Sequence, residues 1–259
     1  MNGRKLVRSH ASNQFCGLAR ALSKLGFCSR TRAFELIREG RVRVNGLLRR
    51  EPESRTQLDQ DRIEVDGKPV ASGTHVYLML NKPRGLVTTA ADEHQRTTVF
   101  ECLAGHDLPF LIPVGRLDKA SEGLLLFTND TGWAARVTDP ESHLDKTYHV
   151  QVNRLVDEGF VERLRAGVVD GDERLKVKRA TLLRSGGRNS WLEIILDEGR
   201  NRHIRRLMAA SECEVLRLVR IAIGPILLGE LSKGQFRMLS EREIQALRGG
   251  YKLDASVAQ

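Results

Sequence analysis

The stretch Gly115–Asp130, which reads GRLDKASEGLLLFTND, constrains the fold of this chain most strongly. Within it, Leu124–Phe127 form a short continuous apolar run between turn-forming residues, which is typical of a fully buried strand, although a short buried helix gives the same pattern. Gly115 permits a tight turn ahead of the run, and Thr128–Asp130 follow it as turn or N-cap residues. We therefore expect Asp118 on a loop before a core element, where a reactive group can be presented. An aspartate in such a loop also commonly does no more than cap a turn.

The same stretch resembles the catalytic motif of the pseudouridine synthases, and more narrowly of the RsuA/RluB-type ribosomal RNA enzymes. The family's GRLD and GLLLFTND stand here as Gly115–Asp118 and Gly123–Asp130. The resemblance implies that Asp118 is the catalytic aspartate. The family's second motif, KTY, stands at Lys146–Tyr148 and implies that Tyr148 stacks on the target base. Without the resemblance, a tyrosine in a strand is more often part of the core.

The family's third motif stands at Glu198–Met208, EGRNRHIRRLM, where the pattern predicts a helix capped by Asn201. The resemblance implies that Arg205 pairs with the catalytic aspartate, and a basic helix face that holds RNA phosphates is the alternative. The first motif, NKPRG, stands at Asn81–Gly85, and its basic residues either contact RNA or are ordinary solvated loop residues. From these motifs and the strand before the third one, we expect the substrate-binding residues to be Lys82, Arg84, Arg116, Arg202, Arg206, Ile194 and Leu196.

The chemistry implied by this resemblance needs few groups. Pseudouridine formation breaks the C1′–N1 glycosidic bond, turns the base and joins C5 to C1′. One ionised aspartate meets the need for a nucleophile, and a guanidinium such as that of Arg205 offsets the cost of burying its charge. The uridine has to leave its stack, and the ring of Tyr148 can receive it, while Ile194 and Leu196 would exclude water. Attack by Asp118 on C1′, attack on C6 and removal of a ribose proton all fit the sequence.

Nothing in the sequence indicates a metal or an organic cofactor, and the chemistry requires none. The four cysteines are widely scattered and form no C-x-x-C pattern, so neither a zinc site nor a disulfide framework is expected. Because no apolar run is long enough to span a bilayer and the N-terminus lacks an apolar signal core, we expect a cytoplasmic protein without membrane contact. We also expect it to act as a monomer.

Positive charge is concentrated at the N-terminal end of the chain. The net charge is +9, and residues 1–70 hold 15 Lys and Arg against 8 Asp and Glu, a surplus of 7. The segment GFCSRTRAFELIREGRVRVNG within it resembles an S4 RNA-binding domain, a helix–helix–hairpin unit. The resemblance and the affinity of guanidinium groups for phosphate together assign RNA contacts to Ser29, Arg30, Arg32, Arg38, Arg41 and Arg43.

The expected fold is α+β: a small N-terminal S4 domain followed by a pseudouridine synthase body on a long, mostly antiparallel sheet, as runs of strands with few helices between them favour. The pattern further predicts a helix over 154–166, strands over 175–183, 191–196 and 215–223, and a helix over 241–248. The expected boundaries are a flexible basic tail over 1–14, the S4 domain over 15–67, a linker over 68–75, the catalytic body over 76–248 and a C-terminal tail over 249–259.

The substrate expected from the resemblance is a ribosomal RNA, most readily a stem-loop of the large-subunit 23S rRNA, free or in an assembling ribosomal particle. The small-subunit 16S rRNA is the alternative target. Two other classes are alternatives: a non-catalytic S4 protein that binds RNA in ribosome assembly, and a glycoside hydrolase that uses Asp118 with Glu122. One departure from the family is that Glu212 stands where a glycine is usual, which would be costly if the backbone there is left-handed.

Overall fold

The computed structural model describes residues 15–71, 73–89 and 96–248. The chain divides into two compact units, Met1–Thr74 and His75–Gln259, which are treated separately below. The expected tails over 1–14 and 249–259 lie outside the described residues. Within the described residues, no helix is long and apolar enough to cross a membrane.

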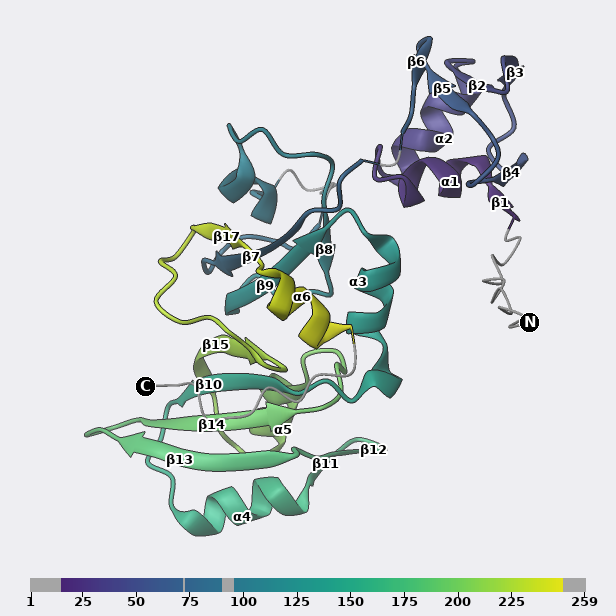
Figure 1. Cartoon of the computed structure of the whole chain (residues 1–259). Coiled ribbons are helices and arrows are strands. Elements are labelled where there is room, and N and C mark those ends of the chain that lie inside the picture. Colours follow the sequence, from purple (N-terminus) through teal and green to yellow (C-terminus); the bar gives the residue numbers. More distant parts are fainter. Residues whose placement is uncertain (1–14, 72, 90–95, 249–259) are drawn as a thin grey trace, which may run out of the picture. The chain divides into compact units, whose positions relative to one another are not determined.

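The first unit consists of two short helices and small antiparallel sheets (Figure 1). Buried side chains from both helices and from the two central strands of the larger sheet form its core. The strand order is β3-β2-β5-β6 in one sheet and β1-β4 in the other. The elements are β1 (Phe15–Gly17), α1 (Leu18–Lys24), α2 (Arg30–Arg38), β2 (Val42–Val44), β3 (Leu47–Arg49), β4 (Arg55–Gln57), β5 (Ile63–Val65) and β6 (Lys68–Pro69).

Local sequence signals explain where these elements begin and end. The Ser29 hydroxyl accepts a hydrogen bond from the Arg32 backbone N–H over 3.1 Å and so caps α2. Asn45 and Gly46 both have positive φ angles, 51° and 80°, as a two-residue hairpin turn between β2 and β3 requires. The expected linker is partly wrong, because Lys68–Pro69 pair with β5 as strand β6 and belong to the sheet of the first unit.

The second unit is built on one large sheet, whose strand order within the described residues is β13-β14-β10-β15-β9-β7-β17; in addition, β16 pairs with β15 and β8 pairs with β9 (Figure 1). All pairings are antiparallel except that of β15 with β9. The expectation of a mostly antiparallel sheet in an α+β fold is confirmed. The strands are β7 (Tyr77–Lys82), β8 (Ile112–Val114), β9 (Glu122–Thr128), β10 (Lys146–Val152), β13 (Arg179–Ser185), β14 (Ser190–Leu196), β15 (Val215–Ile223), β16 (Ile226–Leu227) and β17 (Phe236–Met238); β11 (Val168–Asp170) and β12 (Glu173–Leu175) form a separate hairpin.

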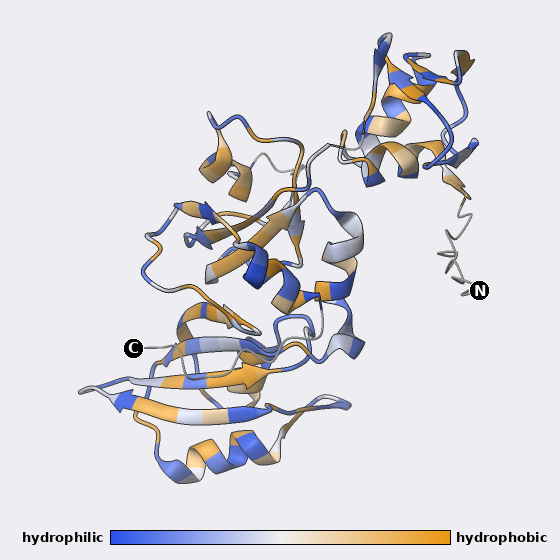
Figure 2. Cartoon of the chain, in the orientation of Figure 1, coloured by the Kyte–Doolittle hydropathy of each residue, from blue (hydrophilic) through white to orange (hydrophobic). Residues whose placement is uncertain are grey.

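The apolar run expected to be a buried strand is β9, which is buried along its whole length and is coloured almost continuously hydrophobic in Figure 2. Leu124 and Leu126 face one side of the sheet, where they pack with Trp133 of α3 (Thr131–Thr138) and with α6 (Glu241–Leu247). Leu125 and Phe127 face the other side, where they pack against the short 3₁₀ helix Val99–Leu103. Both faces of β9 are therefore covered, which explains why its sequence does not alternate.

The other half of the sheet carries α4 (Glu158–Ala166) and α5 (His203–Ala210), which contribute to a shared core cluster with β10, β13, β14 and β15. Three expectations are wrong here. The helix expected from residue 154 begins only after its N-cap Asp157, and Leu155 is exposed. The strand expected over 175–183 is divided, because β12 ends at Leu175 and β13 begins at Arg179. Asn201 does not cap α5: the N-cap residue is Arg202, whose left-handed backbone forms no side-chain cap.

Candidate active site

A cavity of about 810 Å³ lies in the second unit and is lined by the loop after β8, by β10 and β15, and by the segment that leads into α5. It brings together the three residues expected to be catalytic: Asp118, Tyr148 and Arg205. Its charged lining is predominantly basic, with Asp118 and Glu198 as its acidic residues against Arg96, Arg116, Lys119, Lys146, Arg200, Arg202, Arg205 and Arg220.

Asp118 is half-buried on the loop between β8 and β9, as expected. The loop starts at Gly115, whose φ of 74° is left-handed, and continues through a turn in which the Ser121 N–H donates to the Asp118 carbonyl over 2.9 Å. The Thr88 hydroxyl donates to the Leu117 carbonyl over 2.7 Å and ties the loop to a second segment. The backbone around Asp118 is thus held by one hydrogen bond from Ser121 and one from Thr88.

Gly123 is required where β9 meets β15. Its φ is 101°, and a Cβ at this position would collide with the backbone carbonyl of Arg220. Arg220 and Gly123 are register partners in the parallel pair of β15 and β9. Because Gly123 has no side chain, β15 can lie directly against the strand that follows the Asp118 loop.

Lys82 does not contact RNA from the surface, because its side chain is 0 % exposed. Its Nζ atom donates hydrogen bonds to the carbonyls of Asp118 (3.2 Å), Ser121 (2.8 Å) and Pro83 (3.1 Å). Burial lowers the pKa of Lys82 to about 8, although the negative charges of Asp118 and Glu122 oppose this shift. Lys82 is thus a structural cation beneath the Asp118 loop. Its burial follows from its place at the end of β7, inside the sheet.

Glu122 is held away from any reaction. It is 3 % exposed, accepts hydrogen bonds from Arg217 over 2.8 and 3.0 Å, and pairs with Lys233 at 2.6 Å. The hydrogen bond from Arg217 is the main cause that lowers the pKa of Glu122 to about 2. A carboxylate bound in this way cannot serve as the proton donor of a glycoside hydrolase, so the paired-carboxylate alternative with Asp118 is not supported.

Tyr148 lies in β10, opposite Ile194 of β14 on one side and Arg220 of β15 on the other. Its ring is half-buried, packs against the cores on both halves of the sheet, and lines the cavity. Both roles weighed for this residue, core packing and presentation of an aromatic surface to a base, are therefore compatible with its position.

Arg205 lies on α5 and lines the cavity beside the Asp118 loop. Its Nη2 atom donates to the carbonyl of Ala120 over 3.1 Å and its Nη1 atom to that of Val215 over 3.4 Å. No ion pair within 4.0 Å joins Arg205 and Asp118 in the described part of the chain; burial lowers the pKa of Arg205, and the charge of Asp118 opposes that shift. The expected direct pair is thus replaced by hydrogen bonds to the loop backbone, with the Asp118 carboxylate close enough to act electrostatically.

The remaining substrate-binding predictions separate into two groups. Arg116, Arg202 and Leu196 line the cavity. Arg84 and Ile194 do not: Arg84 is exposed outside the lining, and Ile194 of β14 is fully buried in the core. Arg206 also lies outside the lining, because its guanidinium pairs with Asp170 and Glu173 at 2.6 Å each.

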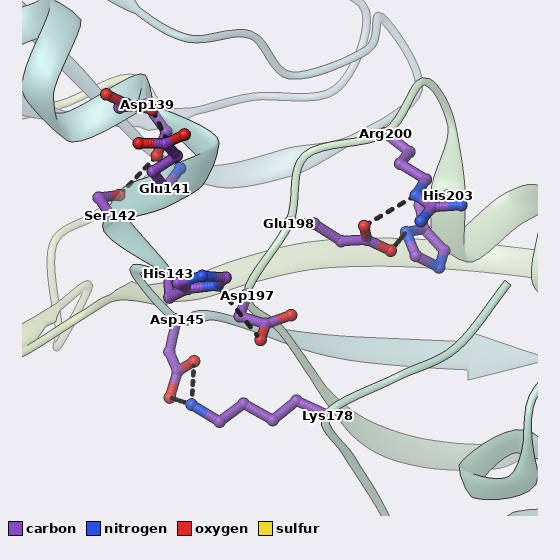
Figure 3. Close-up of polar contacts among 10 residues, drawn as sticks. All are labelled: Asp139, Glu141, Ser142, His143, Asp145, Lys178, Asp197, Glu198, Arg200 and His203. Carbon is purple, nitrogen blue, oxygen red and sulfur yellow. Dashed lines mark hydrogen bonds and ion pairs between the residues drawn. The ribbon is translucent and has the colours of Figure 1, made fainter.

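Other lining residues were not singled out from the sequence. Figure 3 shows Glu198 accepting a hydrogen bond from Arg200 (2.8 Å) and lying near the buried ring of His203 (3.4 Å) at the entry to α5. Burial lowers the pKa of His203 and so favours its neutral form. Lys146 and Arg220 line the cavity beside Tyr148. The signal for Lys146 was present, because it stands two residues before Tyr148 and therefore on the same face of the strand. Within the described residues, no group of His, Cys, Asp and Glu is placed to hold a metal ion.

The family model for RNA pseudouridylate synthase matches residues 76–210, which include Asp118, Tyr148 and Arg205. The chain belongs to this family. A second family model, the S4 domain, matches residues 16–55. As a member of the RNA pseudouridylate synthase family, the chain is an RNA pseudouridine synthase with an N-terminal S4 domain.

Two related proteins and one solved structure agree with this assignment. The chain is 40% identical over 228 residues to an uncharacterized RNA pseudouridine synthase of Aquifex aeolicus, with 87% of this chain and 91% of the relative covered. It is 38% identical over 242 residues to the ribosomal large subunit pseudouridine synthase B of Pseudomonas aeruginosa, with 89% of this chain and 61% of the relative covered. A solved structure described as a pseudouridylate synthase has a TM-score of 0.61 at 30% identity and covers 90% of this chain and 99% of its own.

In the S4 domain of this RNA pseudouridine synthase, the expected RNA-contacting arginines differ in their freedom. Arg32 pairs with Glu35 at 2.8 Å, and Arg41 pairs with Asp66 at 2.6 Å. Arg43 donates to the Gly46 carbonyl over 3.0 Å and stays exposed. Arg30 and Arg38 are exposed on α2, and neither forms an ion pair with any described residue.

Proposed function

We propose that this RNA pseudouridine synthase isomerises a uridine of large-subunit ribosomal RNA, with Asp118 as the catalytic carboxylate and Tyr148 as the surface that receives the base. The single observation that carries this proposal is that one cavity, about 810 Å³ in volume, contains both residues together with Arg205. These residues come from three distant motifs of the sequence. A chain that only bound RNA would have no need to place them together.

The geometry supports a specific division of roles. The target uridine leaves its stack, enters the cavity and lies against the Tyr148 ring, which replaces the stacking it has lost. The Asp118 carboxylate, presented by a loop that is held through its own backbone, then acts on the ribose or the base. Arg205 donates a hydrogen bond to the carbonyl of Ala120, two residues after Asp118, and places a positive charge near the Asp118 carboxylate. The buried apolar side chains of Leu196, Ile204 and Leu218 line the cavity and limit access of water to the detached base.

Exposed basic residues at the cavity provide for the RNA backbone. Arg116 and Arg202 line the cavity and are exposed to solvent, and guanidinium groups in such positions bind phosphate oxygens in two-pronged fashion. The S4 domain adds the basic surplus of residues 1–70. Together they suit a structured RNA that is held by its phosphates while one nucleotide is extruded.

The choice of large-subunit RNA has narrower support. A relative from Pseudomonas aeruginosa at 38% identity is named ribosomal large subunit pseudouridine synthase B. The small-subunit RNA is the alternative target, and with either target we infer a cytoplasmic location. The target is identified by mapping pseudouridine in the ribosomal RNA of cells with and without the gene. A pseudouridine that disappears from the large-subunit RNA and returns with the wild-type gene supports the proposal. A loss confined to the small-subunit RNA would redirect it, and no loss from either RNA would refute a ribosomal target.

A further inference from the structure

The basic residues of the cavity differ in exposure. Arg96, Arg116, Lys119, Arg200 and Arg202 are exposed, and Lys146 and Arg205 are half-buried. Arg220 also lines the cavity but is only 6 % exposed. An RNA chain must enter and leave the cavity, so its phosphates remain near the exposed group. Arg220, as a buried cation, is placed instead for the part of the nucleotide that enters the cavity deepest, which is the base.

The Arg220 guanidinium is incompletely satisfied by the protein. Its Nε atom donates to the Leu124 carbonyl over 2.7 Å, which fixes the orientation of the side chain. Its Nη2 atom is buried and has no hydrogen-bond partner among the described residues, and no described carboxylate forms an ion pair with it. A buried donor without an acceptor is costly, more so when it is charged. Such a group is worth retaining if an acceptor arrives with the substrate.

The position of Arg220 identifies which acceptor it would meet. Arg220 in β15 is the register partner of Tyr148 in β10, next to a register shift between Thr147 and Tyr148. Opposed residues on neighbouring strands project from the same face of the sheet, and both side chains line the cavity. If a base stacks on the Tyr148 ring, the guanidinium lies beside the edge of that base. The edge of uracil carries two carbonyl oxygens, O2 and O4, and both accept hydrogen bonds.

We propose that Arg220 is a catalytic residue that donates a hydrogen bond to a carbonyl oxygen of the target uracil and stabilises the negative charge of the detached base. This inference rests on the proposed function of the cavity. When the C1′–N1 bond breaks, its electron pair goes to the base, the charge spreads over N1, O2 and O4, and C1′ is left electron-deficient. When C5 bonds to C1′, an electron pair of the base forms the new bond and the base becomes neutral; the C5 hydrogen then leaves as a proton and N1 takes up a proton. A donor fixed in place beforehand strengthens as the charge develops, which lowers the barrier to bond cleavage.

Lys146 adds a second positive charge at the same place. It lines the cavity two residues before Tyr148. Burial lowers the pKa of Lys146, and the neighbouring Arg220 lowers it further. Both cations therefore repel each other in the empty cavity and are stabilised together when a negative charge forms between them.

The large- and small-subunit ribosomal RNAs are each transcribed in two forms, one with ordinary uridine and one with 5-fluorouridine. The test compares the two forms of the same RNA. Fluorine at C5 stabilises the uracil anion, so cleavage of the glycosidic bond depends less on help from the protein. The rate at which the N-glycoside at the target site disappears is measured in single turnover for wild type, Arg220→Met and Arg220→Lys. Arg179→Met serves as the matched control, because Arg179 lies on β13 of the same sheet, is exposed and does not line the cavity.

Loss of one fixed donor to a developing anion slows reactions by about 100- to 1,000-fold. We expect Arg220→Met to slow the uridine transcript by this factor and the 5-fluorouridine transcript by about tenfold or less, with RNA affinity within a few-fold of wild type. Arg220→Lys, which keeps the charge, should slow both transcripts less than Arg220→Met does, and should again slow the uridine transcript more than the 5-fluorouridine transcript. If Arg220→Met does not fold, Arg220→Lys supplies the same comparison.

Equal losses on the two transcripts would overturn the inference, because a merely structural arginine does not distinguish the leaving groups. That result, obtained with an active wild-type enzyme, leaves the proposed function intact. Absence of turnover by the wild-type enzyme on both ribosomal RNAs would instead overturn the proposed ribosomal substrate and the inference with it.

Discussion

The ammonium group of Lys82 donates a hydrogen bond to the backbone carbonyl of Asp118 over 3.2 Å, so a fully buried cation holds the loop that presents the proposed catalytic carboxylate. The same ammonium reaches the Ser121 carbonyl three residues further along the loop. A single side chain thus ties together both ends of the turn that carries Asp118. Because these contacts are to the backbone, the Asp118 carboxylate stays available to the substrate.

The first prediction concerns stability. Lys82→Met leaves the carbonyls of Pro83, Asp118 and Ser121 without their partner, and we expect the second unit to lose about 2–4 kcal/mol of unfolding free energy. RNA affinity should stay within a few-fold, because Lys82 is buried. Urea denaturation followed by circular dichroism measures the loss, with the exposed Lys119→Met as control. Loss of RNA affinity without loss of stability would show that Lys82 contacts RNA after all.

The same residue predicts a dependence on pH. The pKa of Lys82, about 8, lies below that of an ordinary lysine, so the folded state holds this proton less tightly than the unfolded state does. Burial of the charged ammonium therefore lowers the unfolding free energy fully below pH 8. As the pH rises from 8 toward about 10.5, the folded protein loses this proton before the unfolded chain does, and its unfolding free energy increases. The difference in unfolding free energy between wild type and Lys82→Met should widen from pH 7 to pH 9.5. A difference that narrows over this range would contradict the lowered pKa.

The second prediction concerns Asp118. Asp118→Asn keeps the shape of the side chain and removes its charge, so we expect pseudouridine formation to fall below detection while RNA affinity changes no more than a few-fold. The control is Asp172→Asn, an exposed aspartate in the turn between β11 and β12. Turnover is measured by mass spectrometry of digested RNA, with deamidation of the variant excluded by intact-protein mass. Measurable turnover by the unmodified variant would remove Asp118 from the nucleophile role.

The third prediction concerns Arg205. Arg205→Met removes the positive charge beside Asp118 and leaves the Ala120 carbonyl without its hydrogen bond from Arg205. We expect activity to fall at least about 100-fold with RNA affinity within a few-fold of wild type, because the loop that presents Asp118 loses both a contact and a nearby charge. Arg205→Lys should rescue poorly, because one ammonium does not span the carbonyls of Ala120 and Val215 as the planar guanidinium does. Single-turnover rates at saturating RNA and the RNA affinities of both variants provide the measurement. A wild-type rate at saturating RNA, together with a weakened RNA complex, would assign Arg205 to phosphate binding instead.

The fourth prediction concerns the S4 domain. Arg30 and Arg38 are exposed and form no ion pair with described residues, whereas Arg32 and Arg41 are each paired with a carboxylate. We expect Arg30→Gln/Arg38→Gln to flatten the log–log salt dependence of RNA binding by about 1.5, which corresponds to two lost phosphate contacts. Arg32→Gln/Arg41→Gln should change it less. Filter binding at several salt concentrations tests both, and equal slopes for the two double variants would show that ion pairing within the domain does not select the RNA contacts.

Elements defined by neighbouring residues could be predicted from the sequence. The apolar run of β9, the Ser29 cap of α2 and the Asn45-Gly46 hairpin each depend on interactions within a few residues of the chain, and the structure has all three. The family motifs likewise identified Asp118 and Tyr148 as site residues, and both line one cavity. What joins them is the sheet, whose strand order follows from the fold of the family rather than from local periodicity.

Contacts between distant segments could not be predicted in the same way. Lys82 was expected to bind substrate RNA, with a solvated loop residue as the alternative, because the sequence does not show that β7 continues to it or that the Asp118 loop folds over it. Arg206 looked like a phosphate ligand, because its partners Asp170 and Glu173 stand more than thirty residues away on the β11–β12 hairpin. Arg220 carried no motif signal of its own, and only the pairing of β15 with β10 places it beside Tyr148.

The last prediction follows from the departure at Glu212. Its backbone is left-handed, with a φ of 53°, and its N–H donates to the Ala209 carbonyl over 3.0 Å in the turn after α5. A residue with a Cβ pays roughly 1–2 kcal/mol for this conformation, and a glycine avoids that cost but is more flexible when unfolded. We therefore expect Glu212→Gly to stabilise the second unit by about 0.5–1 kcal/mol and to leave activity unchanged. Glu212→Ala separates backbone strain from the loss of the charged side chain, because it keeps the Cβ and should change stability by less than about 0.5 kcal/mol. Calorimetry that resolves the transition of the second unit provides the measurement. Equal stabilisation by both variants would place the cost in the glutamate side chain rather than in its backbone.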